Sequence, residues 1–167
     1  MRTITRLNVY LSMVAMILMA ALAVPAAAQQ QVPFQGTFLG KDTISPGPSP
    51  TSVLLSTSAT GTGTHLGRFS FTQEFTLNGA LTYIGSARWV AANGDIIYTT
   101  IVGSAIPGDV VFTLTEIHTI TGGTGRFSSA SGNFTVHRTH VAAANDDGTH
   151  DTSGWYEGSI TPPGAAH

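Results

Sequence analysis

Residues 67–103, GRFSFTQEFTLNGALTYIGSARWVAANGDIIYTTIVG, form the stretch that decides the fold. In residues 69–77, four apolar side chains and one Gln occupy every second position, and Ser, Thr and Glu occupy the positions between them. Side chains of a β-strand alternate between its two faces, so this pattern predicts a strand with one face in a core and the other in water. Asn78-Gly79 and Asn93-Gly94 separate it from two further strand-like runs and are typical of tight hairpin turns. The stretch therefore predicts three consecutive antiparallel strands.

The rest of the chain repeats short alternating runs between Gly-rich breaks. No segment after Ala28 has the apolar spacing of an amphipathic helix, so the domain is predicted to be all-β. Regularly spaced strands with short turns indicate an antiparallel barrel or sandwich. The eight expected strands are residues 33–40, 51–58, 65–77, 80–91, 95–103, 109–120, 127–141 and 150–160.

One domain is expected to cover residues 29–167. Within it, residues 41–50 contain three prolines, which cannot donate to a sheet, so this segment is predicted to be a loop at the rim. The end of the chain, residues 161–167, is predicted to be a disordered tail after Pro162-Pro163-Gly164.

Residues 1–28 are typical of a secretory signal peptide. Two arginines precede an apolar run at residues 9–24, and three alanines at 26–28 predict cleavage after Ala28. The alternative is an N-terminal membrane anchor, but the run is shorter than the roughly 20 residues that a spanning helix needs. We therefore expect a secreted or periplasmic protein with no stable membrane anchor after cleavage.

The composition excludes several kinds of chemistry. The chain of 167 residues has no Cys, so disulfides, thiolate nucleophiles and thiol-bound metals are ruled out. Cleavage after Ala28 would leave 139 residues with five basic and nine acidic side chains, a formal net charge of −4. With no basic surplus, nucleic acid is not an expected partner.

A tetrapeptide occurs twice, as Gly67-Arg68-Phe69-Ser70 and Gly125-Arg126-Phe127-Ser128. Each copy follows a Gly- and Thr-rich turn. We expect the glycine to supply an unusual backbone angle at a strand entry, the Arg to point outward and the Phe to close a barrel end. Two copies would then occupy equivalent positions in one closed sheet.

Residues 121–127, TGGTGRF, followed by Ala130, Gly132 and Phe134, resemble the GGTG-x-F-x-x-A-x-G segment of the dirigent and allene oxide cyclase barrel family. Residues 63–69 resemble a segment that is frequent in small secreted bacterial proteins of the same barrel type. The sequence resemblance covers residues 115–136 and 61–71. Elsewhere only the expected arrangement of strands is similar.

This resemblance implies an eight-stranded, calycin-like antiparallel barrel with a central apolar cavity, often assembled as a homotrimer. In plant members the cavity guides cyclisation of an allene oxide fatty acid or stereoselective coupling of phenolic radicals. The matched motif is a turn and a strand entry, so it carries the fold rather than catalysis.

The expected strand 109–120 is the most informative for chemistry. If its apolar even positions face the interior, Glu116 and His118 face it too. A buried carboxylate is costly unless paired and often titrates unusually, so Glu116 and His118 are the predicted catalytic pair. Glu116 would position a hydroxyl or a water while His118 shares the proton. The alternative is that both lie at the wet mouth of the barrel, paired with each other or with an arginine.

A polar cluster is expected beside this pair, because Arg138 and His140 share a face of the next strand and could meet it across the sheet. An exposed barrel rim would give the same pattern. Aromatic residues at alternating positions are either pocket walls, with Tyr83 and Tyr98 as hydroxyl donors, or ordinary core. The predicted ligand-binding residues are Phe71, Tyr83, Trp89, Tyr98, Phe112, Leu114, Phe134, Arg138 and His140.

No metal site and no cofactor are expected. Glu116-x-His118 can offer two ligands on one face, but His137 and His140 fall on opposite faces of a strand and no three-His spacing occurs. The expected function is binding of a small hydrophobic molecule in the barrel, with cyclase- or isomerase-like activity as an extension of it. The competing hypothesis is a structural or interaction protein of the cell envelope whose barrel is filled.

Overall fold

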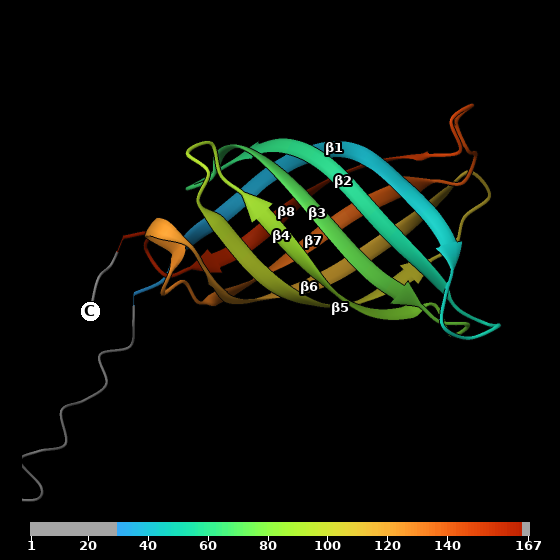
Figure 1. Ribbon diagram of the computed structural model, residues 1–167, viewed down its shortest axis with the longest axis horizontal. Helices are drawn as coiled ribbons and strands as arrows, with labels where there is room; N and C mark the ends of the chain where they lie inside the picture. The colour runs from blue at the N-terminus through green and yellow to red at the C-terminus, as the bar shows by residue number, and fades with distance from the viewer. Residues whose placement is uncertain (1–29, 165–167) are drawn as a thin grey trace, which may run out of the picture.

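Eight antiparallel strands form a closed barrel in chain order, with each strand paired to the next and β8 paired to β1 (Figure 1). The structure is a computed structural model and describes residues 30–164. The predicted all-β, eight-stranded closed antiparallel barrel is therefore confirmed. Its elements are β1 (Val32–Pro46), β2 (Val53–Gly63), β3 (Gly67–Leu77), β4 (Thr82–Val90), β5 (Ile96–Ile106), β6 (Val111–Gly123), the short 3₁₀ helix η1 (Gly125–Phe127), β7 (Gly132–Val141) and β8 (His150–Ile160).

The barrel is closed by β1, which pairs with both β8 and β2. Its pairing with β8 runs from Val32 opposite Ile160 to Asp42 opposite His150. Its pairing with β2 continues to Pro46, which lies opposite Val53. Full closure leaves no unpaired sheet edge, which matters for a chain without disulfides. The fold is therefore held together by strand pairing and by packing of the interior, without crosslinks.

Alternation decides what faces the interior, as the sequence of β3 predicts. Phe69, Phe71, Gln73 and Phe75 are buried inside the barrel, and the residues between them are exposed. The same alternation on β6 places Leu114, Glu116, His118 and Ile120 inside. These strands therefore have one dry face and one wet face.

Glycines on the inner face make room for the large side chains of neighbouring strands. A Cβ at Gly85 would lie 2.5 Å from the Cβ of Phe75, and one at Gly158 would lie 2.6 Å from the Cβ of Phe134. In both cases the glycine is the direct partner of the aromatic residue in the sheet. An eight-stranded barrel has little interior space, and at these two positions the aromatic ring fits because the opposite residue carries no side chain.

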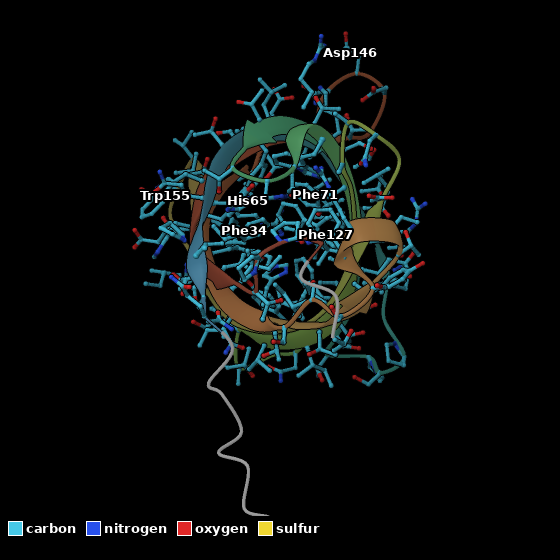
Figure 2. The ribbon with its side chains drawn as sticks, turned by 90° about the vertical axis from the view of Figure 1, so that its left-hand side faces the viewer. Phe34, His65, Phe71, Phe127, Asp146 and Trp155 are labelled. Carbon is cyan, nitrogen blue, oxygen red and sulfur yellow. The ribbon has the colours of Figure 1, made fainter. Side chains whose placement is uncertain are left out.

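One end of the barrel is closed by η1 and the loop between β2 and β3. Phe127 and Leu66 are both fully buried there, and Figure 2 shows Phe127 and Phe34 across this end. The glycines of both tetrapeptide copies have positive φ, 66° at Gly67 and 54° at Gly125. The second copy, however, forms the 3₁₀ turn of η1 instead of entering a strand, so the two copies are not equivalent positions in the sheet.

Several predicted boundaries were wrong. β1 continues to Pro46, well into the range 41–50 predicted to be a loop, because it pairs with β2 up to that residue. β7 begins at Gly132 and not at 127, because η1 takes the preceding residues. In the predicted tail, Thr161 is buried and its N–H donates to Ser131, and Gly164 donates to Arg126. The predicted signal peptide lies outside the described residues.

Replacing Gly85 by Ala is expected to lower the free energy of unfolding by about 1 to 3 kcal/mol, because the new Cβ would overlap the Glu74 carbonyl and Phe75. Gly79→Ala, in the β3–β4 turn, is the matched control, because its Cβ would meet nothing closer than 3.6 Å. Denaturant unfolding of both variants measures the difference. Equal stability of the two variants would contradict the role given to the inner glycines.

Candidate functional site

A layer of polar side chains crosses the middle of the barrel. Nearly all of the buried polar residues of the described chain belong to it, and alternation on seven of the strands points them inward. They are Asp42, Thr57, Gln73, Thr99, Glu116, His118, Arg138, His140 and Thr152, joined by the hydroxyl of Tyr83. Glu116 and His118 are 0% exposed, so both lie inside the barrel and not at a wet mouth.

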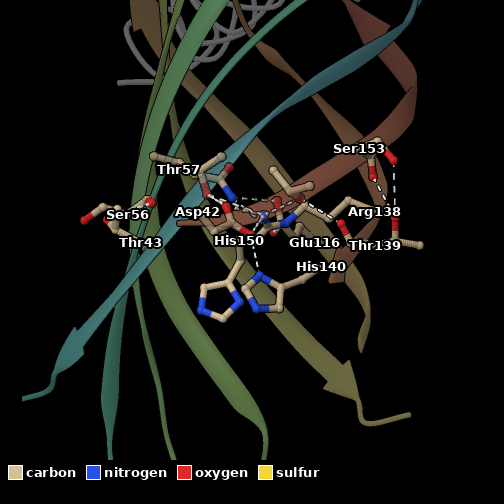
Figure 3. Close-up of polar contacts among 12 residues, drawn as sticks. Asp42, Thr43, Ser56, Thr57, Glu116, Arg138, Thr139, His140, His150 and Ser153 are labelled. Atoms are coloured by element: carbon tan, nitrogen blue, oxygen red, sulfur yellow. Dashed lines mark hydrogen bonds and ion pairs between the residues drawn. The ribbon is translucent and has the colours of Figure 1, made fainter. Parts of the chain in front are cut away.

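Arg138 is the centre of this layer (Figure 3). Its Nε donates to Glu116 Oε1 at 2.7 Å, and its Nη1 donates to both carboxylate oxygens of Asp42 at 3.0 Å. Nη1 also donates to the Thr152 hydroxyl at 3.1 Å. One guanidinium thus bridges carboxylates from β1 and β6, as the predicted meeting of Arg138 with Glu116 requires.

Glu116 is held as a carboxylate. Burial alone would raise its pKa, but the Arg138 charge and the hydrogen bond from His118 lower that pKa from the ordinary 4.5 to about 2. Gln73 Nε2 and the Tyr83 hydroxyl also donate to it, at 3.2 and 3.4 Å. Glu116 is therefore an acceptor with all of its neighbours donating, and it carries no proton near neutral pH.

Asp42 plays the same part on the opposite side of Arg138. Burial opposes its ionisation, but the hydrogen bond from His140 and the Arg138 charge hold its pKa below the ordinary 3.8. Thr57 donates its hydroxyl to Oδ1 at 2.6 Å, and His140 Nδ1 lies 2.7 Å from Oδ2. An ionised carboxylate only accepts, so Nδ1 of His140 carries the proton of that bond.

His118 is held on both ring nitrogens. Its Nε2 lies 3.1 Å from Glu116 Oε2 and its Nδ1 lies 2.9 Å from the Thr99 hydroxyl. Because Glu116 is ionised, Nε2 is the donor in that bond, and Nδ1 is paired with the Thr99 hydroxyl. The ring also stacks on Phe134, with centroids 4.8 Å apart. His118 is therefore fixed within the polar layer and has no free ring nitrogen.

A small cavity of about 190 Å³ opens at the end of the barrel opposite η1, above the polar layer. Its walls are almost wholly apolar, and His140 is the one polar residue that borders it. The lining residues are Ile44, Val53, Leu55, Leu77, Ala105, Phe112, Leu114 and His140. Of the predicted ligand-binding residues, Phe112, Leu114 and His140 line this cavity.

The other predicted ligand-binding residues lie elsewhere. Phe71, Trp89 and Phe134 fill the opposite half of the barrel, where Phe71 and Trp89 stack with centroids 4.3 Å apart and Phe134 packs on the Trp89 edge. Tyr83 and Arg138 belong to the polar layer. Tyr98 is 41% exposed on the outer wall, so its predicted role as an inward hydroxyl donor was wrong. Its neighbours Ile97 and Thr99 are the buried residues of that part of β5.

Asp42 is the main functional residue that the sequence reasoning missed. It fell in the segment predicted to be a loop, although it has the same parity as Phe34 and Phe38, which are buried. Extending that alternation through the segment would have placed Asp42 inside. Gln73 was correctly placed on the inner face, but only its contact with Glu116 shows that it belongs to the polar layer.

The polar layer has two unused atoms within residues 30–164. Arg138 Nη2 and Gln73 Oε1 are buried and have no hydrogen-bond partner there. One donor atom and one acceptor atom of the layer are therefore unsatisfied within these residues, and neither belongs to a residue that lines the cavity. In the same part of the chain, no set of three or more His, Asp and Glu side chains is arranged to hold a metal ion.

Acid titration is expected to destabilise the barrel. The pKa of Glu116 is lower in the folded chain than its ordinary value of 4.5. The ionised carboxylate therefore stabilises the fold, and this stabilisation is fully present above about pH 4.5. This stabilisation is lost as the pH falls from 4.5 towards 2. Glu116→Gln is expected to lower the free energy of unfolding at pH 7 by about 3 to 5 kcal/mol, because Arg138 loses a partner, and to flatten the pH dependence.

Denaturant unfolding between pH 2.5 and 7 checks this expectation, with Glu74→Gln as the matched control on the outer face of β3. The control is expected to change stability by less than about 0.5 kcal/mol. An unchanged pH profile in Glu116→Gln would refute the assignment of Glu116 as a buried, ionised partner of Arg138.

Comparisons with known proteins add little to this geometry. No protein-family model matches the chain, and no curated protein matches its sequence. Among solved structures, the chain is similar to the pterocarpan synthase dirigent protein GePTS1, with 12% identity, a TM-score of 0.49, and coverage of 80% of this chain and 93% of that one. The barrel itself rests on the strand pairing of this chain, and membership of the family stays a prediction.

Proposed function

We propose that the open end of the barrel binds a small, mainly apolar molecule that carries one hydrogen-bonding group. The observation that carries this proposal is the cavity of about 190 Å³, walled by Val, Leu, Ile, Ala and Phe side chains and bordered by His140. Apolar walls with one fixed polar group are typical of sites that bind small organic molecules.

The size of the cavity limits the ligand. An engineered apolar cavity of about 150 Å³ is large enough to bind benzene. Drug-sized ligands occupy pockets of roughly 300 Å³ or more. The cavity therefore suits a single ring or a short branched chain and is too small to enclose a whole fatty acid derivative.

His140 supplies the polar contact. Asp42 holds the Nδ1 proton, which leaves Nε2 as the ring nitrogen that would accept a hydrogen bond from a ligand. A second imidazole, His150, stacks on His140 with centroids 4.7 Å apart, and Phe112 contacts it edge-on, so the ring has little freedom to turn. A ligand hydroxyl that donates to Nε2 would meet an acceptor already in position.

Cyclase- or isomerase-like activity would be an extension of this binding. His140 is the titratable group that borders the cavity, so we assign to it any proton transfer to a bound molecule. Glu116 and His118, the pair singled out in the sequence, are better placed to hold the polar layer in position, because neither lines the cavity. Their charge and hydrogen bonds would act on a ligand through Arg138, Asp42 and His140.

A filled barrel with a structural or interaction role is the second candidate. The closed, aromatic half of the interior favours it, because Phe69, Phe71, Trp89, Phe134 and Tyr156 pack there ring against ring. In that case the cavity is a packing defect at the mouth and binds nothing. Ligand titration separates the two candidates.

Export and assembly remain predictions. The segment that predicts cleavage after Ala28 is not part of residues 30–164, and within those residues no helix is long and apolar enough to cross a membrane. A homotrimer is likewise expected only from the resemblance. Both can be settled by the N-terminal sequence and the mass of the protein recovered from its native cell.

The binding proposal is tested by titrating the protein with toluene and p-cresol, which differ by one hydroxyl, and following side-chain methyl signals by NMR. Saturable binding of both is expected, with p-cresol tighter because it can donate to His140. Ala105→Phe places a large side chain in the cavity and is expected to lower the affinity for both molecules by about tenfold or more. Ser104→Phe, the adjacent outward position, is the control and should bind as the parent does.

His140→Phe is expected to lower the affinity for p-cresol to that for toluene and to leave the affinity for toluene unchanged. Absence of saturable binding to the parent protein would favour the filled barrel. Equal effects of Ala105→Phe and Ser104→Phe would show that the molecules bind somewhere other than the mouth.

A further inference from the structure

A groove crosses the outer wall of the barrel over β8, β1, β2 and β3. The sheet register places Trp155, Thr37, Thr62 and Arg68 in one row, each the direct partner of the next. The two threonines are small, so they form a floor between the larger Trp155 and Arg68. Hollows of about 420 Å³ beside Trp155 and about 600 Å³ beside Arg68 share this floor.

Trp155 is an exposed aromatic wall of this groove. Figure 2 shows it projecting from the outside of the barrel, and it is 44% exposed. His137 of β7 stacks on it, with ring centroids 4.3 Å apart and planes 24° from parallel. Since β7 and β1 lie on opposite sides of β8, the face of the indole turned away from His137 borders the groove. A flat apolar surface is thus held upright by a neighbouring ring.

Polar groups surround this aromatic surface. The floor offers the hydroxyls of Thr37 and Thr62, and Gln35 and Glu157, which are direct partners in the sheet, border the Trp155 hollow. At the other end, the Arg68 guanidinium has no ion-pair partner among the described residues 30–164. The groove therefore combines one aromatic face, several neutral donors and acceptors, the carboxylate of Glu157 at the Trp155 end, and one cation without an ion-pair partner at the Arg68 end.

We propose that this groove binds an acidic oligosaccharide, with a neutral sugar ring on Trp155 and the carboxylate of an adjoining uronic acid at Arg68. A pyranose ring has an apolar C–H face that stacks on an aromatic ring, and its hydroxyls project from the rim toward donors and acceptors. Trp155 and Arg68 are three strand spacings apart, about 14 Å, which is the span of two linked sugar rings with their substituents.

Charge favours an acidic sugar at the Arg68 end. The chain has a formal net charge of −2, so general electrostatic attraction does not favour an anion. If the protein binds the acidic disaccharide more tightly than the neutral one, the difference is therefore due to the nearby guanidinium of Arg68. The groove lies on the outer wall, so this proposal is independent of ligand binding inside the mouth.

The test is a titration with cellobiose and with cellobiouronic acid, a disaccharide pair that differs by one carboxylate. The chain has two Trp residues, and Trp89 is fully buried, so acrylamide quenching of the exposed Trp reports on Trp155. We expect both sugars to protect Trp155 from quenching in a saturable way, and cellobiouronic acid to bind about tenfold more tightly. Isothermal titration calorimetry gives the affinities in variants that lack the Trp.

Three variants complete the test. Trp155→Ala is expected to weaken both sugars by about tenfold or more, and Arg68→Gln to reduce cellobiouronic acid to the affinity of cellobiose without changing cellobiose. Tyr98→Ala removes a similarly exposed aromatic residue from β5 and should change neither. The proposal is overturned if neither sugar binds, if Trp155→Ala binds as tightly as the parent, or if Tyr98→Ala loses as much affinity as Trp155→Ala.

Discussion

The interior of this barrel depends on the two ion pairs of Arg138. Its guanidinium lies between Asp42 of β1 and Glu116 of β6, and Gly154 of β8 leaves it room, since a Cβ there would lie 2.7 Å from the Cβ of Arg138. A buried charge is tolerated only when it is paired and hydrogen-bonded, so the register of four strands must bring these groups together. The resulting polar layer separates an aromatic, filled half of the barrel from a small apolar mouth.

This layer also determines what chemistry the mouth can support. Because Arg138 keeps both carboxylates ionised, they orient imidazoles and do not donate protons. Asp42 fixes the proton of His140 on Nδ1 and leaves Nε2 facing the apolar end, while both nitrogens of His118 are engaged by Glu116 and Thr99. Only one polar group therefore meets a molecule in the cavity, and binding or proton transfer there depends on a single ring.

Much of this arrangement follows from alternation in the sequence. Residue parity predicted the inward positions of β3 and β6 and the meeting of Glu116 with Arg138. The closed barrel was expected from the resemblance carried by residues 115–136. Prediction failed where local signals oppose the tertiary pairing. The prolines after Asp42 suggest a loop, but pairing with β2 keeps β1 extended to Pro46, and the second tetrapeptide copy forms η1. The volume of the cavity could not be predicted from the sequence either, because it depends on how the aromatic rings pack over the inner glycines.

The most direct test of this account compares Arg138→Met alone with Arg138→Met combined with Asp42→Asn and Glu116→Gln, by denaturant unfolding at pH 7. If Arg138 neutralises two buried carboxylates, the single variant loses about 3 to 5 kcal/mol of unfolding free energy, because both charges remain buried without it. The triple variant, which removes those charges, then recovers most of the loss. A triple variant no more stable than the single one would contradict the account.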